Sequence, residues 1–218
     1  MVESPKSYNE MLAKLNTAAF LTTLVYCVML VYFRYLPRVA LSRGLVPPAK
    51  DYKELIEWIL SFGVIPLLAA LVAYFLSSAF EIHNVVSKVT RLRSFWDRRF
   101  IVRPLALRAQ CRRQLSRKDV DKVMAFYYQE VANINQHYVH TFWRYALFFW
   151  VLFEHILFVL ISLPFVCMLG SPSWCLLWYL AIVVALATLQ FFFVTGQKST
   201  AQANVIALDK VTGFFRLL

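Results

Sequence analysis

Two ionisable side chains stand next to each other in the middle of an apolar segment. Glu154 and His155 lie about ten residues into the stretch Tyr145–Met168. A charged group at that depth of a bilayer costs free energy unless it faces protein or water, so it is a functional candidate by default. We predict that both residues belong to a pore or its gate. The alternative is a buried Glu–His pair, or a protonated Glu154, that holds helices together.

A second set of polar residues recurs near the C-terminus. Gln190, Gln197 and Asn204 follow one another at seven-residue spacing. Three more polar residues lie close by in the sequence: Thr195, Ser199 and Gln202. A polar stripe at heptad spacing is typical of a helix that faces its symmetry mates or lines water. The three heptad residues are therefore our further pore or gate candidates.

The segment 81–144 holds thirteen Lys and Arg residues against five acids. Ten of the thirteen are arginine, which binds phosphate groups in a bidentate manner. We predict an anion-binding surface for a nucleotide or an oligonucleotide. Its predicted residues are Lys88, Arg91, Arg98, Arg99, Arg103, Arg108, Arg112 and Arg113. The alternative is attraction to anionic lipid headgroups, worth about 1 kcal/mol for each basic residue.

Three aromatic residues lie among these arginines: Phe95, Trp96 and Phe100. They have the chemistry to stack on nucleotide bases. Their spacing also places them on the apolar face of a predicted helix, where packing is the simpler role.

The sequence shows no pattern of a catalytic site. It has no Gly-rich phosphate loop, no Gly-x-Ser-x-Gly and no His-Glu-x-x-His. His137, His140 and Glu130 share nearly one helix face, but a metal site needs three or four converging ligands and the second set is missing. We therefore predict no catalytic residue, no metal and no cofactor. The weaker alternative is an integral-membrane enzyme that uses Glu154 with the two histidines.

The composition is that of a membrane protein. Hydrophobic residues make up 60% of the chain, against about half in soluble domains. A helix of about 20 apolar residues crosses a bilayer, and four stretches qualify: Leu15–Phe33, Trp58–Phe80, Tyr145–Met168 and Trp174–Val194. We expect Pro66 to kink the second span, a loop over 36–53 and a tight turn over 170–173.

Apolar residues continue at three- and four-residue spacing beyond the second span, from Ile82 to Phe100. This spacing predicts a continuous helix that Pro104 ends or bends, with a short basic helix over Leu105–Leu115. Ser116 and Asp119 predict a capped helix start, and the pattern after them runs straight into the third span. The last helix should continue past Val194 towards Asp209.

The predicted fold is therefore an all-α integral membrane protein. It has four transmembrane helices, with helical cytoplasmic extensions of helices 2 and 3 that pack on each other. We divide it into transmembrane helices 1 and 2 (residues 1–80), a basic helical bundle (81–144), transmembrane helices 3 and 4 (145–194) and a C-terminal helix (195–218). The positive-inside rule places the basic bundle and both termini in the cytoplasm.

One stretch resembles a known group of proteins. It comprises His83-Asn84, Ser87-Lys88, Arg91, Phe95-Trp96-Asp97 and Arg103-Pro104-Leu105-Ala106, directly after a membrane helix. It is similar to the juxtamembrane part of small multi-span effectors in bacterial anti-phage systems. There, a cytosolic nucleotidyltransferase-type partner makes the nucleotide or oligonucleotide that controls the effector. The resemblance implies an oligomeric ion channel of the inner membrane that depolarises the cell when it opens.

The leading hypothesis is a homo-oligomeric channel, since several copies around an axis can enclose a water path more easily than four apolar spans of one copy. An anionic ligand at the basic bundle would control it. The rival hypothesis is a non-conducting membrane adaptor that recruits a cytosolic partner or anionic lipid. A transporter is less favoured, because no internal repeat is evident.

Overall fold

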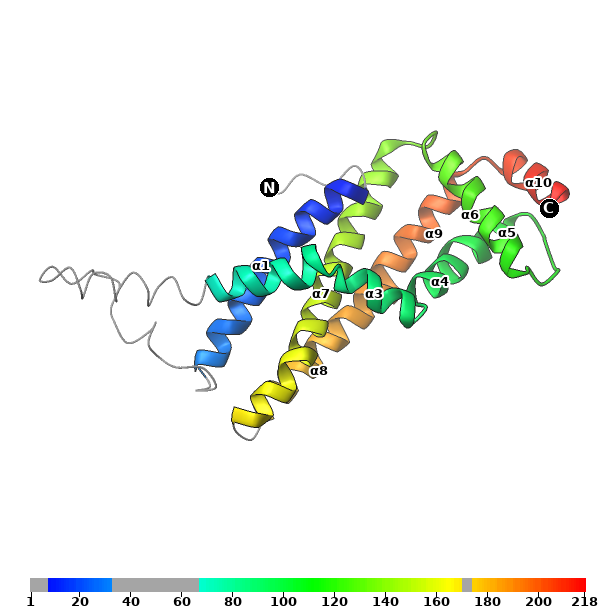
Figure 1. The fold of residues 1–218 in the computed structure, drawn as a ribbon. Coiled ribbons are helices and arrows are strands. Elements are labelled where there is room, and N and C mark those ends of the chain that lie inside the picture. The colour runs from blue at the N-terminus through cyan, green and yellow to red at the C-terminus, as the bar shows by residue number, and fades with distance from the viewer. Residues whose placement is uncertain (1–7, 33–66, 170–173) are drawn as a thin grey trace, which may run out of the picture. The chain divides into compact units, whose positions relative to one another are not determined.

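A computed structural model describes residues 8–32, 67–169 and 174–218 (Figure 1). All regular secondary structure in these ranges is helical, which confirms the all-α prediction. The predicted loop over 36–53, the first part of the second span with Pro66, and the predicted turn over 170–173 lie outside the described residues.

Three helices are long and apolar enough to cross a membrane: Glu10–Leu30 within α1 (Tyr8–Tyr32), most of α7 (Gln136–Leu169), and Trp174–Val205. The third consists of α8 (Trp174–Leu189), a π-helical segment η4 (Gln190–Thr195) and α9 (Gly196–Val205). A fourth candidate span is bent, so the described chain has three or four spans. The protein is thus a multi-span helical membrane protein.

The predicted continuous helix after the second span is wrong. The helical segment Leu67–Ala79, which ends in the π-helical segment η2 (Tyr74–Ala79), meets α3 (Ile82–Val89) at a bend of 50°. Glu81 and Arg91, which follow these two helices, have φ of 43° and 56°. Right-handed helix cannot continue through a left-handed residue, so the chain changes direction at both positions.

Three short segments follow without a gap: α4 (Leu92–Trp96), the π-helical segment η3 (Asp97–Val102) and α5 (Arg103–Arg108). Pro104 therefore does not end the helix but stands in the first turn of α5, directly after the widened turn of η3. The expected basic helix over Leu105–Leu115 is too long, because α5 ends at Arg108 and Gln110 has a φ of 54°.

The capped helix start is confirmed. α6 (Arg117–Val131) begins after Ser116, whose hydroxyl accepts from the Asp119 N–H while the Asp119 carboxylate accepts from the Ser116 N–H. The predicted unbroken run into the third span is wrong, because the chain leaves the helix at residues 132–135. Asn135 then accepts a hydrogen bond from the His137 N–H and so begins α7.

The last helix continues past Val194, as predicted, but ends at Val205 before reaching Asp209. A separate amphipathic helix, α10 (Leu208–Leu217), closes the chain.

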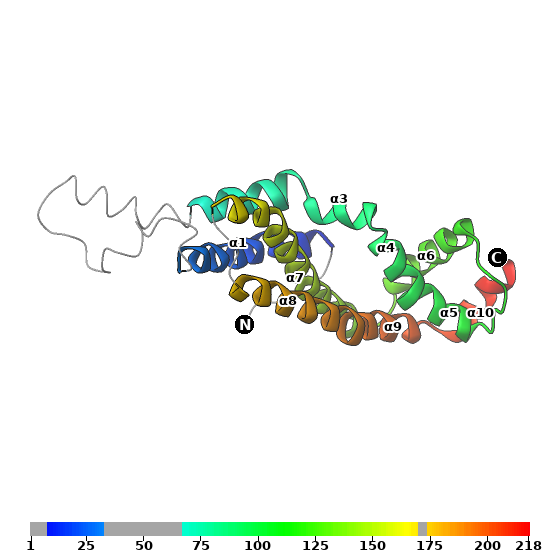
Figure 2. The ribbon, with the colours of Figure 1, turned by 90° about the horizontal axis from the view of Figure 1, so that it is seen from below.

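The chain forms two compact units. In unit 1 (Met1–Leu12, Asn84–Phe149, Leu186–Leu218), η3 and α5 pack against α9, α6 packs against η3 and α9, and α10 packs against α5 (Figure 2). The core of this unit is aromatic, with Trp96 edge-on to Phe149 and Phe191. Unit 2 (Ala13–His83, Trp150–Ala185) has a core that includes Tyr26, Leu30, Val159, Val166 and Leu176.

Candidate functional site

The carboxylate of Glu154 is the centre of a buried polar cluster in unit 2. Its side chain is only 5% exposed, and its oxygens lie 3.0 and 3.1 Å from the Ser77 hydroxyl and 2.6 Å from Nδ1 of His83. Ser77 also lies 2.8 Å from the Asn16 amide oxygen. Burial of a carboxylate is tolerable only with such donors, so these partners keep Glu154 inside the spans.

The break at Glu81 makes this cluster possible. Ser77 and His83 are six positions apart, so in a continuous helix their side chains would point about 120° apart and be separated by about 9 Å along the axis. The 50° bend brings both onto one carboxylate. A non-glycine residue in the left-handed region is strained, and such strain is concentrated at functional sites.

His155 makes a different set of contacts from its neighbour. Its Nε2 lies within hydrogen-bond distance of the Tyr179 hydroxyl of α8, and its ring stands edge-on to Tyr26 of α1. Tyr26 in turn bonds the Ser162 hydroxyl at 2.8 Å. Glu154 therefore pairs with His83 and not with its neighbour His155, which belongs to an aromatic cluster.

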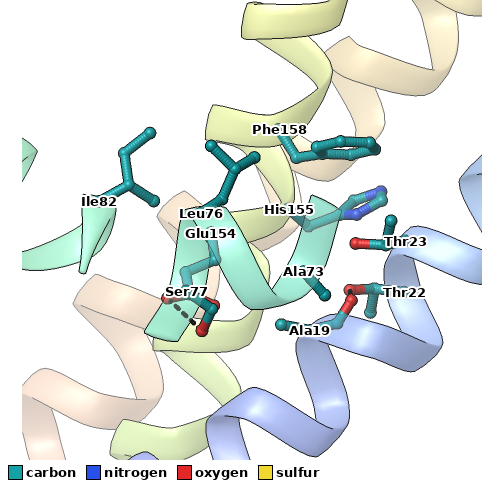
Figure 3. A pocket seen from close by; sticks show the side chains of 10 residues that line it. All are labelled: Ala19, Thr22, Thr23, Ala73, Leu76, Ser77, Ile82, Glu154, His155 and Phe158. Carbon is teal, nitrogen blue, oxygen red and sulfur yellow. Dashed lines mark hydrogen bonds between the residues drawn. The ribbon is translucent and has the colours of Figure 1, made fainter. Parts of the chain in front are cut away.

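A small cavity lies beside both residues. Its volume is about 20 Å³, and it is lined by Ala19, Thr22, Thr23, Ala73, Leu76, Ser77, Ile82, Glu154, His155 and Phe158 (Figure 3). A single water needs about 10–15 Å³ of such space. The polar part of the lining consists of the carboxylate, the imidazole and three hydroxyl groups, so the cavity suits one water rather than an apolar ligand.

Two buried histidine nitrogens in unit 2 have no hydrogen-bond partner among the described residues: Nε2 of His83 and Nδ1 of His155. Buried polar atoms in native proteins are almost always satisfied by protein or water. We therefore expect each of these nitrogens to bind a water molecule or to carry a proton.

The sequence makes Glu154 and His155 candidates for a pore or gate, but it does not show which residues they contact. Asn16, Ser77, His83 and Tyr179 come from four other parts of the chain. Their positions inside or next to apolar runs were the available signal, since a polar residue there needs a partner.

The polar stripe near the C-terminus divides over two faces. Gln190 donates to the Tyr145 carbonyl at 3.3 Å, while Gln197 and Asn204 are exposed and line an open groove of about 280 Å³ with Phe100, Phe192, Gly196, Thr200 and Ala201. The other polar residues are buried in unit 1, where Thr195, Ser199 and Gln202 bond Tyr145, Trp96 and Tyr127.

Seven of the eight predicted ligand-binding residues are exposed in unit 1: Lys88, Arg91, Arg98, Arg99, Arg103, Arg112 and Arg113. Arg113 lies 3.5 Å from the Asp119 carboxylate. Arg108 differs from them, because its guanidinium donates to the carbonyls of Ala203 and Ile206 at 3.0 and 2.8 Å. It therefore caps the C-terminal end of α9, where a cation is favourable.

The aromatic residues among the arginines pack within unit 1. Trp96 is buried and donates its indole N–H to Ser199, and Phe100 contacts Phe191 and Phe192 edge-on. Phe95 is exposed on one side and stacks on Phe191 with its other.

Close packing of α9 on η3 depends on two further features. A Cβ atom on Gly196 would lie 2.5 Å from the Phe100 ring, so only glycine fits there. One turn later, the Thr200 hydroxyl donates to the Phe100 carbonyl at 3.0 Å. This hydrogen bond joins the side chain of α9 to the backbone of η3.

Burial raises the pKa of several groups in unit 1. It raises the pKa of Asp97 to about 6, although Arg93 lowers it. It also raises the pKa of Tyr127, so this phenol stays protonated and donates to Gln202.

The weak metal candidate does not assemble. Glu130 binds the Lys210 ammonium at 2.7 Å, and His137 contacts the Tyr138 ring. Within the described ranges, no group of three or more His, Cys, Asp or Glu side chains converges on one point.

Comparison with known proteins gives the family. The model of the YmfE protein family matches residues 7–217. The chain is also 36% identical to the uncharacterized protein YmfE of Escherichia coli (strain K12) over 225 residues, which cover 99% of this chain and 96% of that protein. No solved structure matches the chain. The multi-span helical protein described above belongs to the YmfE family.

Proposed function

We propose that this protein is an ion channel of the inner membrane, formed by several copies and controlled through its exposed basic helices. The observation that carries the proposal is the buried cluster around Glu154. An ionisable group held between membrane helices by a histidine and a serine is expensive, and such groups mark ion pathways. Glu154 is the one buried carboxylate among the described residues, and it also lines a cavity large enough for a water.

Several copies are proposed because the described residues of one copy enclose only a small cavity between the membrane helices. The cavity beside Glu154 holds only about one water, and the candidate spans expose large apolar side chains such as Leu21, Phe165 and Ile182. Cyclic assembly encloses a path between identical surfaces. We place the groove of α9 with Gln197 and Asn204 at such an interface, since it combines exposed amides with an apolar floor.

The position of α3 supports control by an anionic ligand. This helix carries His83 at its second residue and Lys88 in its last turn, and Arg91 lies two residues beyond its end. A ligand that binds these cations more tightly in one conformation of the channel increases the population of that conformation. The change would reach Glu154 through α3, because α3 also carries its partner His83. Nucleotides and oligonucleotides fit the exposed arginines by charge and bidentate geometry.

The resemblance to anti-phage effectors supplies the proposed context. A cytosolic nucleotidyltransferase-type partner would make the ligand, and opening would depolarise the cell. The exposed basic surface also suits a non-conducting adaptor that binds a cytosolic partner or anionic lipid, which is the second candidate.

Flux from liposomes tests the proposal. Purified protein is reconstituted into liposomes, and the flux of ions across their membrane is followed with and without ATP or a short oligonucleotide, while light scattering gives the size of the detergent complex. We expect ion flux from an oligomer and a change in this flux on addition of the anion. The pair R98E/R99E should remove that change, whereas the matched pair K118E/K122E should keep it. A monomer that is silent under all conditions would favour the adaptor.

A further inference from the structure

Two polar clusters of unit 2 meet at one cavity. On one side are Glu154 and its partners Ser77 and His83, and on the other is His155 with Tyr179. Figure 3 shows the Glu154 carboxylate beside Ser77 and the His155 imidazole beside Thr23 of α1, and all four residues line the cavity.

His155 lines this cavity and has one buried ring nitrogen without a hydrogen-bond partner among the described residues. His155 is 5% exposed and lines the cavity, its Nε2 is engaged by Tyr179, and its Nδ1 has no partner in the described part of the chain. One water in a space of about 20 Å³ would lie among the carboxylate, this nitrogen and the threonine hydroxyls. That number of polar groups is what a buried water requires.

We propose that the cavity is a proton-transfer site, in which one water links the carboxyl group of Glu154 to the imidazole of His155, and that the conducted ion is the proton. This inference rests on the proposed function and names its substrate. In the transfer step, protonated Glu154 gives its proton to the water while the water gives one of its own to Nδ1 of His155. The products are a carboxylate and an imidazolium, and no bond between heavy atoms changes.

The surroundings favour this exchange over passage of a metal cation. Glu154 faces Ser77, His83 and Asn16, and His155 faces Tyr179 and Tyr26. None of these partners carries a fixed positive charge, so either group can hold the proton. A bare Na⁺ or K⁺ would need about six oxygen ligands, which a water-sized cavity does not supply. Chains of acids and histidines are the usual proton relays of membrane proteins.

The polar residues also extend along the spans. Asn16 and Tyr26, which contact the two clusters, are ten positions apart on α1. This separation corresponds to about 15 Å, or half of a hydrocarbon core of about 30 Å.

Two measurements on the full-length protein test the inference. Liposomes containing a pH-sensitive dye report proton flux driven by a K⁺ gradient with valinomycin, and parallel liposomes report K⁺ flux without valinomycin. Infrared difference spectra between about pH 5 and about pH 8 report protonation of buried carboxyl groups in the same protein. The variants are E154Q and H155Q, and S162A is the matched control because Ser162 bonds Tyr26 but does not line the cavity.

Wild type and S162A should carry protons and show a protonated-carboxyl band. E154Q should lose the band and lower proton flux at least about tenfold, since removal of a positioned proton-transfer group costs about 10²-fold or more in enzymes. H155Q should lower the flux and keep the band. K⁺ efflux with proton flux unchanged in E154Q would overturn the inference and leave the channel in place. Absence of all flux and of the band would overturn both.

Discussion

Ser77 and His83 lie on opposite sides of a helix break and bind the same carboxylate, that of Glu154. A straight helix cannot present both side chains to one point. The left-handed residue Glu81 between them therefore has a structural consequence, because it places two hydrogen-bond partners of Glu154 on neighbouring segments that meet at an angle.

Removal of His83 should destabilise the protein strongly. H83A leaves a buried carboxylate with fewer donors, and breaking a buried pair in this way costs about 3–5 kcal/mol. The free energy of unfolding in detergent should fall accordingly, and the double variant H83A/E154Q should lose less than the sum of the single variants. K210A, which breaks the partly exposed pair of Lys210 with Glu130, should cost less than about 1 kcal/mol. If H83A and K210A lose the same free energy of unfolding, the buried pair stabilises the protein no more than the exposed pair does.

The hydroxyl of Thr200 should stabilise the packing of α9 on η3. T200V removes a donor to the Phe100 carbonyl and should lower the free energy of unfolding by about 1–3 kcal/mol, while T200S should retain most of it. A chemical denaturation series compares both variants with the wild type. If T200V and T200S have the same free energy of unfolding, the hydrogen bond does not contribute to stability.

Two glycines in unit 1 should respond to alanine in opposite ways. At Gly196 a Cβ atom would overlap the Phe100 ring, whereas at Gly213 nothing lies within 4 Å. G196A should therefore lower the thermal unfolding temperature, and F100L should recover part of the loss by removing the ring. G213A should leave it unchanged or raise it, since alanine gains about 1 kcal/mol over glycine in a helix. A neutral G196A would show that α9 does not pack this closely on η3.

Asp97 should make stability depend on pH. Burial raises its folded pKa to about 6, above about 3.9 in the unfolded chain, so the folded protein binds more protons between these values. The contribution of this group is therefore most favourable below about pH 4, decreases as the pH rises to about 6 and is constant above that. D97N should flatten this part of the stability profile measured by denaturation at several pH values. The exposed control D121N should keep the slope, and a slope unchanged in D97N would contradict the assignment.

The sequence was most informative where local rules decide the structure. The apolar runs predicted the membrane helices, and Ser116 with Asp119 predicted the start of α6, because a capping box depends on residues three apart. The depth of Glu154 in an apolar segment also predicts a side chain that needs buried partners, and Ser77 and His83 provide them.

The remaining features depend on tertiary contacts. The breaks at Glu81 and Arg91 use left-handed residues other than glycine, and no turn signal announces them. The pairing of His83 with Glu154 joins residues 71 positions apart. Arg108 has the same charge as its neighbours in the sequence, and only the fold shows that it caps α9.

Current across a planar bilayer tests the central claim most directly. Size-defined complexes of wild type and E154Q are inserted and recorded side by side, in buffers that contain protons, K⁺ and Cl⁻ at known gradients, with and without a short oligonucleotide. The proposal predicts current from the wild-type oligomer that E154Q reduces while the complex keeps its size. A wild-type protein that carries no current under any of these conditions would contradict it.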